Sequence, residues 1–178
     1  YMRFLLNREP TDNEVERSTV EKEALYRKIF GPHLAAPAGL MPLLKFARGK
    51  KVMCGVATSA PEENVKFVLD GLNIRHYFNE VVDATHVKNC KPDPEIYRVA
   101  ADRLGVEPGR CLVFEDAIAG IKSAKAAGMR VIALTSSYPA DVLADYAPSA
   151  IIRSFDDLYK PCPARELVEK VTGHKLAV

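Results

Sequence analysis

The sequence predicts an α/β fold whose core is a doubly wound parallel sheet. Short apolar segments that suit buried strands alternate along the chain with segments whose apolar residues recur at helical spacing. The connections between these segments are short, which is typical of parallel βα units. Polar residues also gather where several apolar segments end, and in such sheets the carboxyl ends of the strands form the edge at which ligands bind.

The elements are expected in strict alternation. The expected strands cover residues 51–57, 80–84, 111–114, 130–134 and 150–152, and the expected helices cover residues 42–48, 62–70, 94–104, 117–127, 139–145 and 164–172. Pro61 and Pro94 stand at helix starts, where a missing N–H costs nothing, and Gly105 and Gly128 stand just past helix ends. The last helix either packs on the core or stays loose.

Composition excludes several classes of function. With 178 residues and 48% hydrophobic content, the chain can build one sizeable core and a small accessory element. A formal net charge of +2 gives no reason to expect nucleic acid or a membrane surface as a partner. The four cysteines lack metal-type spacing, which favours a reducing cytoplasm. No apolar run is as long as a membrane span, and no signal peptide is visible.

Two adjacent carboxylates, Glu115 and Asp116, follow the apolar segment that ends at Phe114. We expect them in a strand-to-helix loop, because the apolar residues from Ile118 onwards recur at helical spacing. Neighbouring ionised acids repel each other, so they suggest a bound cation, and a few hard oxygen ligands suit Mg²⁺. The alternative is that both acids only cap the helix and complement its dipole.

Thr58 and Lys91 occupy comparable positions at the ends of other expected strands. The Thr58 hydroxyl, with Ser59 and the N–H groups of the turn, can hold a phosphoryl oxygen at the start of a helix; otherwise this segment is an ordinary helix cap. Lys91 precedes Pro92, so the chain fixes its position, and a fixed ammonium can neutralise a phosphate. Its alternative role is that of a solvated surface lysine.

Together these residues resemble the haloacid dehalogenase superfamily, in the branch of phosphoglycolate phosphatases, β-phosphoglucomutases and sugar-phosphate phosphatases. The matching segments are Ala38-Gly39-Leu40, Val56-Ala57-Thr58-Ser59, Lys91-Pro92-Asp93-Pro94-Glu95, Phe114-Glu115-Asp116-Ala117-Ile118-Ala119-Gly120 and Ala126-Ala127-Gly128-Met129. The resemblance covers roughly residues 38–155 and is specific as a set. It favours the functional interpretation of these residues jointly.

The resemblance implies a phosphohydrolase mechanism. An Asp at the end of the first core strand attacks the phosphoryl group and forms an aspartyl-phosphate, and a second Asp two residues later acts as acid and base. Mg²⁺ would be held by Glu115 and Asp116, Thr58 would bond to the phosphoryl group, and Lys91 would stabilise the charge on nucleophile and phosphate. The implied partner is a small phosphorylated metabolite, with neither nucleic acid nor membrane involved.

One part of the family pattern is missing. The sequence has no Asp-x-Asp-Gly motif and no strand ahead of Thr58 that carries one. We therefore expect an upstream segment of roughly 40 residues, comprising the strand, its loop and about two helices. In the family fold this strand lies between the strand that ends at Thr58 and the strand that ends at Phe114.

Three parts of the chain are expected. Residues 1–37 resemble the remnant of a helical cap domain, 38–161 the α/β core, and 162–178 a C-terminal helix or tail. In the cap helix we expect the i to i+4 ion pair of Glu23 with Arg27, and Lys22 is expected to point at substrate, although most charges there cover a solvated face.

Three functions remain open at this stage: an Mg²⁺ phosphatase, a β-phosphoglucomutase-like phosphomutase, and a non-catalytic fragment or paralogue. The mutase would use the same aspartyl-phosphate but return the phosphoryl group to another hydroxyl. Dehalogenation itself is not expected, because that chemistry needs no metal and would leave Glu115 and Asp116 unexplained. Substrate specificity in this family depends mainly on the cap, so the sequence does not identify the substrate.

Overall fold

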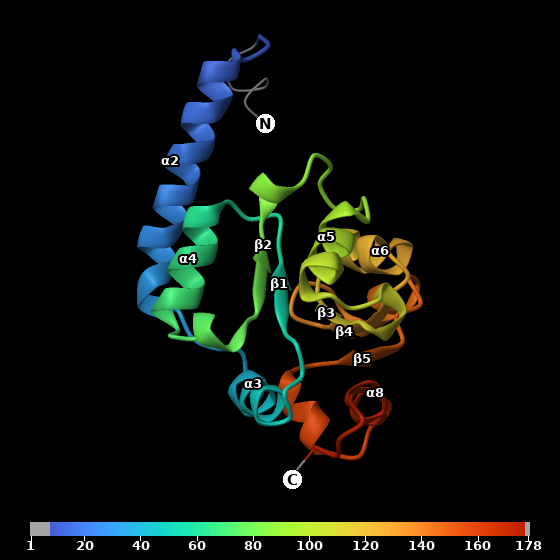
Figure 1. The fold of residues 1–178 in the computed structure, drawn as a ribbon. Helices are drawn as coiled ribbons and strands as arrows, with labels where there is room; N and C mark the ends of the chain where they lie inside the picture. The colour runs from blue at the N-terminus through green and yellow to red at the C-terminus, as the bar shows by residue number, and fades with distance from the viewer. Residues whose placement is uncertain (1–7, 177–178) are drawn as a thin grey trace.

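The structure, a computed structural model, describes residues 8–176 (Figure 1). Its helices are α2 (Asp12–Phe30), α3 (Leu40–Gly49), α4 (Glu62–Gly71), α5 (Glu95–Leu104), α6 (Ile118–Ala126), α7 (Ala140–Ala144) and α8 (Pro163–Thr172), and its strands are β1 (Gly55–Ala57), β2 (Glu80–Val82), β3 (Leu112–Glu115), β4 (Arg130–Leu134) and β5 (Ala150–Ile152). Every strand pairing is parallel, so the predicted fold class is confirmed.

Two expected boundaries were wrong. β1 begins at Gly55 and not at residue 51, because the preceding residues complete α3: Lys51 has a φ of 56°, and the Val52 N–H donates to the Ala47 carbonyl at 2.8 Å. Glu115, expected in a loop, is the last residue of β3 and is 9% exposed. The first acid of the pair is therefore part of the sheet.

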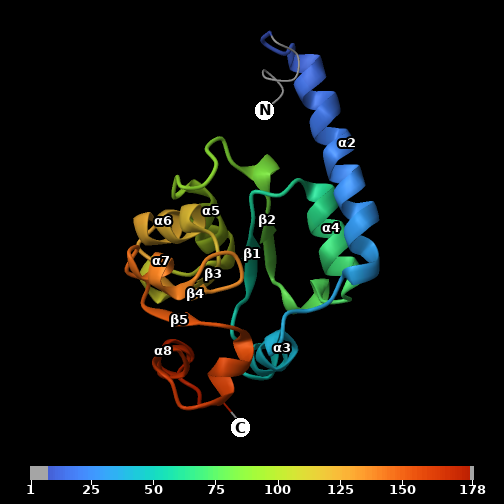
Figure 2. The same ribbon diagram turned by 180° about the vertical axis from the view of Figure 1, so that it is seen from behind.

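The strands form two separate sheets. β1 pairs with β2, and β3, β4 and β5 form a second sheet in that order. Figures 1 and 2 show the two-stranded sheet beside α4, and the three-stranded sheet beside α6. The division falls between β1 and β3, where the sequence analysis expects a further strand.

The pairing pattern shows which backbone groups face this division. In a parallel pair, alternate residues direct both N–H and C=O to the same neighbour. The Cys54 carbonyl and the Thr58 N–H bond to the chain of β2, so Gly55 and Ala57 direct their groups to the opposite edge. In the other sheet the Cys111 carbonyl accepts from Arg130 of β4. Leu112 and Phe114 of β3 therefore present their groups to the same division.

A cavity of about 630 Å³ separates the two free edges. All three residues of β1 and all four of β3 line it, together with apolar side chains such as Leu44 of α3, Ala101 of α5 and Val168 of α8. Within residues 8–176 these edge groups make no strand pairing, although the Ala57 carbonyl accepts the Lys91 ammonium, and two such edges with an apolar surround suit one more parallel strand. The cavity lies where the sequence analysis expects a further strand, and that strand stays a prediction.

Helices cover both faces of the strands. Val82, Val131 and Ala133 join the side chains of α5 and α6 in one buried cluster. On the other face, Val56 and Val81 contact the cluster of α3 and α4, and Ile132 and Ile152 belong to the cluster that includes α8. The last helix thus packs on the core, which settles the alternative left open by the sequence. Within residues 8–176, no helix is both long enough and apolar enough to span a membrane.

Helix α2 begins at a capping box and touches the core near its other end. Thr11 is the N-cap, and its side chain and backbone exchange hydrogen bonds with Glu14. The expected direct ion pair of Glu23 with Arg27 was wrong: both residues bond instead to the buried amide of Asn64 at the start of α4, at 2.5 and 2.6 Å. One amide of the core therefore binds two successive turns of α2.

Candidate active site

The carboxyl ends of β1 and β3 meet at Lys91. The Lys91 Nζ donates to the Ala57 carbonyl at 3.1 Å, to the Tyr97 hydroxyl at 3.0 Å and to the Glu115 carboxylate. Only 12% of the Lys91 side chain and 9% of that of Glu115 are exposed, so this ion pair is largely removed from water. The structure therefore brings Lys91 and Glu115 into contact next to Ala57, which precedes Thr58 in the chain.

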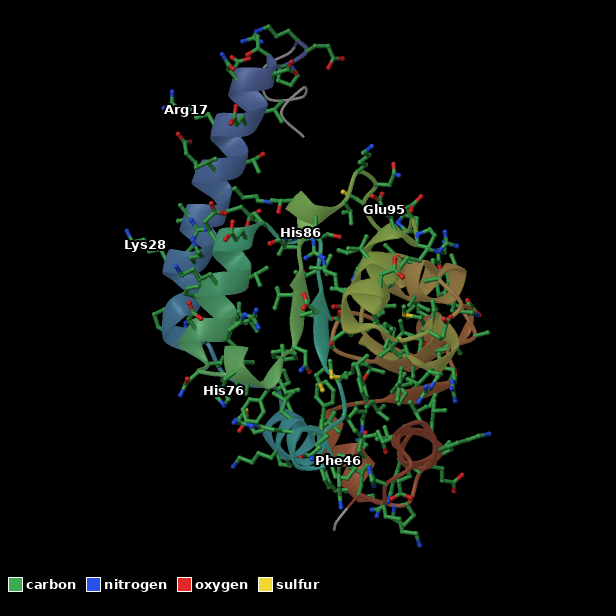
Figure 3. All side chains as sticks on the ribbon, in the orientation of Figure 1. Arg17, Lys28, Phe46, His76, His86 and Glu95 are labelled. Atoms are coloured by element: carbon green, nitrogen blue, oxygen red, sulfur yellow. The ribbon has the colours of Figure 1, made fainter. Side chains whose placement is uncertain are left out.

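The loop that carries Lys91 is held by the first turn of α5. The Glu95 carboxylate accepts the backbone N–H groups of Lys88 and Asn89 at 3.0 and 2.9 Å. The Lys91–Pro92 peptide bond is cis. In Figure 3, His86 and Glu95 lie at this edge of the molecule, whereas Phe46 of α3 lies at the opposite end. Lys91 thus reaches the sheet edge from a segment that the Glu95 carboxylate holds in place.

Glu115 uses both of its carboxylate oxygens. Oε1 accepts from Lys91 and, at 2.8 Å, from the Tyr97 hydroxyl. Oε2 accepts the N–H groups of Asp116 and Ala117 at 3.1 Å each, which caps the start of α6. One Glu115 oxygen, Oε2, therefore caps α6, as the alternative interpretation of the sequence proposes. The other, Oε1, binds Lys91 and Tyr97.

Gly120 makes room for this carboxylate. A Cβ atom at Gly120 would lie 1.9 Å from Glu115 Oε1, which is closer than any non-bonded contact allows. The sequence analysis assigns Gly120 a structural role in helix packing; the atom it must avoid is a side-chain oxygen of the site. Gly120 lies on α6, one turn beyond the acids.

The sequence analysis missed Tyr97 as a site residue. Tyr97 lies on α5, is 5% exposed, and its hydroxyl contacts both Lys91 and Glu115. Burial, followed by the negative charge of Glu115, raises the pKa of Tyr97 above its ordinary value, so the hydroxyl keeps its proton and donates it. In the sequence Tyr97 reads as one more apolar position of a helix, next to Ile96, and no local signal sets it apart.

Asp116 has different surroundings from Glu115. Its Oδ2 accepts the hydroxyls of Ser136 and Ser137 at 3.0 and 2.5 Å, from the loop that follows β4. No hydrogen bond to Oδ1 is present within residues 8–176. Asp116 therefore has one oxygen fixed by the protein and one available to a cation, and the two serines are further neighbours that sequence reasoning missed.

Thr58 lies at the end of β1, half-buried, with Ser59 exposed after it. The Thr58 N–H donates to the Val82 carbonyl at 2.9 Å, and its Oγ1 accepts the Ala60 N–H at 3.1 Å. The hydroxyl proton is left free to be donated to a ligand. A cavity of about 330 Å³ adjoins Thr58 and is lined by Glu23 and Tyr26 of α2 together with residues of α4.

Lys22 is not brought into this group of residues. Its Nζ pairs with Glu23 at 2.6 Å, and 71% of its side chain is exposed. Glu23, the neighbour of Lys22, is the residue that lines the cavity beside Thr58. The contact of Lys22 with substrate stays a prediction.

The donor set suits a hard cation in part. Asp116 offers a free carboxylate oxygen, whereas Glu115 already accepts four hydrogen bonds. Within the described part of the chain, no group of three or more His, Cys, Asp or Glu side chains is arranged to hold a metal. Of the two acids, Asp116 therefore has the oxygen that is free to bind a cation, and the metal-ligand roles of Glu115 and Asp116 stay predictions.

Comparison with known proteins identifies the family of this chain. The family model for haloacid dehalogenase-like hydrolases matches residues 3–128. The fructose-1-phosphate phosphatase of Escherichia coli is 42% identical over 54% of this chain and 50% of that protein. The phosphorylated carbohydrates phosphatase of Thermotoga maritima is 37% identical over 60% of this chain and 49% of the relative. The chain thus spans about half the length of these curated relatives.

Solved structures agree with the fold. A family IA haloacid dehalogenase hydrolase from Entamoeba histolytica has a TM-score of 0.82 at 26% identity, covering 96% of this chain and 76% of that one. A β-phosphoglucomutase from Clostridium difficile has a TM-score of 0.76 at 25% identity, covering 92% of this chain and 69% of that one. The chain belongs to the haloacid dehalogenase-like hydrolase family.

Proposed function

We propose that the complete protein is an Mg²⁺-dependent phosphatase of a small phosphorylated metabolite, such as a sugar phosphate, and that it acts through an aspartyl-phosphate. The observation that carries this proposal is the meeting of Lys91 with Glu115 and the end of β1, because it places a fixed positive charge beside Thr58. Relatives named as phosphatases of fructose 1-phosphate and of phosphorylated carbohydrates support the substrate class.

The residues of this chain would divide the work by position. Lys91 holds positive charge at the sheet edge, where negative charge grows during phosphoryl transfer. Thr58 donates its free hydroxyl proton to a phosphoryl oxygen, and Ser59 offers a second hydroxyl in the same turn. Glu115 balances the Lys91 charge and fixes its place. In these roles the side chains contribute through their positions relative to the phosphoryl group, and catalysis of phosphoryl transfer depends largely on such positioning.

Mg²⁺ would be held by Asp116 through its free oxygen, with Glu115 as the second predicted ligand. When bound, it would neutralise charge on the phosphoryl group and help to orient it. Ser136 and Ser137 keep the other Asp116 oxygen fixed, so the free oxygen has a defined direction. The carboxylate pair thus has one member directed to the metal and one that mainly holds Lys91.

The nucleophile would arrive on a strand in the cavity between β1 and β3. A parallel strand there would bond to Gly55 and Ala57 on one side and to Leu112 and Phe114 on the other. Its carboxyl end would lie beside Lys91, Thr58 and Glu115, where an aspartate can reach a bound phosphoryl group. Residues 1–37, proposed as part of the cap, would cover the organic part of the substrate at the cavity beside Thr58.

The test compares two lengths of protein. The 178-residue chain is assayed with Mg²⁺ against p-nitrophenyl phosphate and several sugar phosphates, beside a version extended by the codons that precede Tyr1 in genomic DNA. We expect the extended version to be an active, soluble phosphatase. The shorter chain should be silent and either poorly soluble or paired with another chain, because its two strand edges are open.

Robust turnover by a monodisperse 178-residue monomer would show that the nucleophile lies elsewhere in the chain. Release of an isomerised sugar instead of free phosphate from a hexose 1-phosphate would identify a phosphomutase. Absence of an Asp-x-Asp motif upstream, with an inactive extended protein, would leave the non-catalytic alternative.

A further inference from the structure

We infer that Tyr97 is a positioning residue of this site: its hydroxyl completes a cradle of three acceptors that fixes the Lys91 ammonium at the carboxyl edge of the sheet. The inference deepens the proposed function, because the position of Lys91 matters most if Lys91 faces a transferring phosphoryl group. Neither the sequence pattern nor the likeness to known proteins assigns Tyr97 a role.

The Lys91 ammonium has one acceptor for each of its donors. An ammonium has three N–H donors, and three acceptors surround this one: the Ala57 carbonyl at 3.1 Å, the Tyr97 hydroxyl at 3.0 Å and the Glu115 carboxylate. The acceptors come from the end of β1, from α5 and from the end of β3. Since 12% of the side chain is exposed, water cannot readily replace a lost acceptor. Each acceptor therefore restrains the Lys91 ammonium in one direction.

The Tyr97 hydroxyl is both a hydrogen-bond donor and a hydrogen-bond acceptor in this site. It donates to Glu115 Oε1 at 2.8 Å, which turns its lone pairs towards Lys91. The same carboxylate oxygen accepts from Lys91, so the three groups form a closed triangle of hydrogen bonds. Buried networks of this kind strengthen each member when all are satisfied, and they loosen when one is removed. Tyr97 thus fixes Lys91 directly and through Glu115.

The hydroxyl and the ring of Tyr97 each contact Lys91, and a substitution can remove the first contact while keeping the second. The Lys91 Nζ lies 4.7 Å from the centroid of the Tyr97 ring, a cation–π distance. Phenylalanine at this position keeps the ring and the packing of a residue that is 5% exposed, and it removes the hydroxyl alone. Tyr97→Phe therefore tests the cradle without opening a cavity the size of a side chain.

The chain offers a matched control at Tyr146. The Nζ of Lys122 lies 5.0 Å from the centroid of that ring, so the pair repeats the cation–π contact. The Tyr146 hydroxyl makes no hydrogen bond within residues 8–176. Tyr146→Phe thus removes a hydroxyl from beside a lysine without removing an acceptor. Any effect specific to the cradle should be absent from this variant.

The experiment uses the full gene product and two measurements. Hydrogen exchange of the Lys91 ammonium is followed by ¹⁵N NMR of lysine side chains, with Lys91→Arg used to assign the signal, and kcat and KM are measured on a sugar phosphate. We expect Tyr97→Phe to speed the exchange at Lys91 by about tenfold, and to lower kcat by about tenfold with KM changed less than about twofold. Tyr146→Phe should match wild type in both measurements.

In an active enzyme, an exchange rate or a kcat within about twofold of wild type in Tyr97→Phe overturns the inference. A fall in kcat with the Lys91 exchange unchanged also overturns it, because Tyr97 would then act by another route. If the wild-type gene product hydrolyses no phosphate ester, the proposed function fails and the exchange rate alone decides whether Tyr97 positions Lys91. The two failures are therefore distinguishable.

Discussion

The two sheets of this protein differ in how completely they are packed. In the three-stranded sheet, Val131, Ile132 and Ala133 of the central strand β4 are at most 1% exposed. In the two-stranded sheet only Val82 is buried to that extent, and no residue of β1 is buried. Both sheets border the cavity between β1 and β3, but the sheet that ends at Glu115 also contains a fully packed central strand, whereas the sheet that ends beside Thr58 contains none.

Lys91 is the polar link between the two sheets. It bonds to the Ala57 carbonyl of the two-stranded sheet and to Glu115 of the three-stranded sheet. The comparison therefore predicts that loss of the Asp116 carboxylate changes the chemistry and spares the fold, and that loss of the Lys91 link disturbs both.

Asp116→Ala tests the three-stranded side. In the full gene product it should abolish Mg²⁺-dependent phosphatase activity while the free energy of unfolding stays near that of wild type, because within residues 8–176 the Asp116 side chain bonds only to two exposed serines. Steady-state kinetics and urea unfolding measure the two quantities. Retention of more than about a tenth of kcat, a barrier change below about 1.4 kcal/mol, would contradict the metal assignment.

Lys91→Met breaks the link. Removing one partner leaves Glu115 charged and buried, at a cost of about 3–5 kcal/mol in the free energy of unfolding. Adding Glu115→Gln should recover a large part of that loss in urea unfolding. In the active protein, kcat should fall more than KM rises, because the charge that Lys91 balances is greatest during transfer. An unchanged kcat and stability would make Lys91 an ordinary surface lysine.

Gly120→Ala tests the support of Glu115 from within the three-stranded side. The new Cβ would overlap a carboxylate oxygen, so we expect a loss of about 1–3 kcal/mol in the free energy of unfolding. Gly109→Ala is the control, since no atom lies within 4 Å of a Cβ there, and it should change stability by less than about 0.5 kcal/mol. Equal effects at the two glycines would contradict the described placement of Glu115.

Thr58→Ala tests the two-stranded side and should have the smallest effect. One neutral hydrogen bond is worth about 1 kcal/mol, so we expect a loss of about fivefold in kcat/KM for the active protein. Thr58→Ser, which keeps the hydroxyl, should stay near wild type. A loss as large as that of Asp116→Ala would reverse the ranking drawn from the comparison.

The sequence predicts the position of the site because chain direction determines it. Thr58, Lys91 and Glu115 each follow an apolar segment, and parallel strands bring such positions to one edge. Tyr97 and Ser136 were not predictable, because their contacts depend on how α5 and the loop after β4 lie against β3. The start of β1 was predicted at residue 51 instead of Gly55 for a related reason: the backbone after α3 bonds to that helix, which residue type alone does not reveal.

The position of the Asn64 contact along helix α2 affects how that helix can move. At 1.5 Å per residue its 19 residues make a rod of about 28 Å, and the bonds to Asn64 lie in its second half. The opposite end extends past α4 (Figure 1). A tilt of about 10° about this contact would move Asp12 by roughly 3 Å, estimated from the same helical rise. The Asn64 contact would thus be the point about which α2 tilts, and a small rearrangement of that amide would be enlarged at the N-terminal end of the helix.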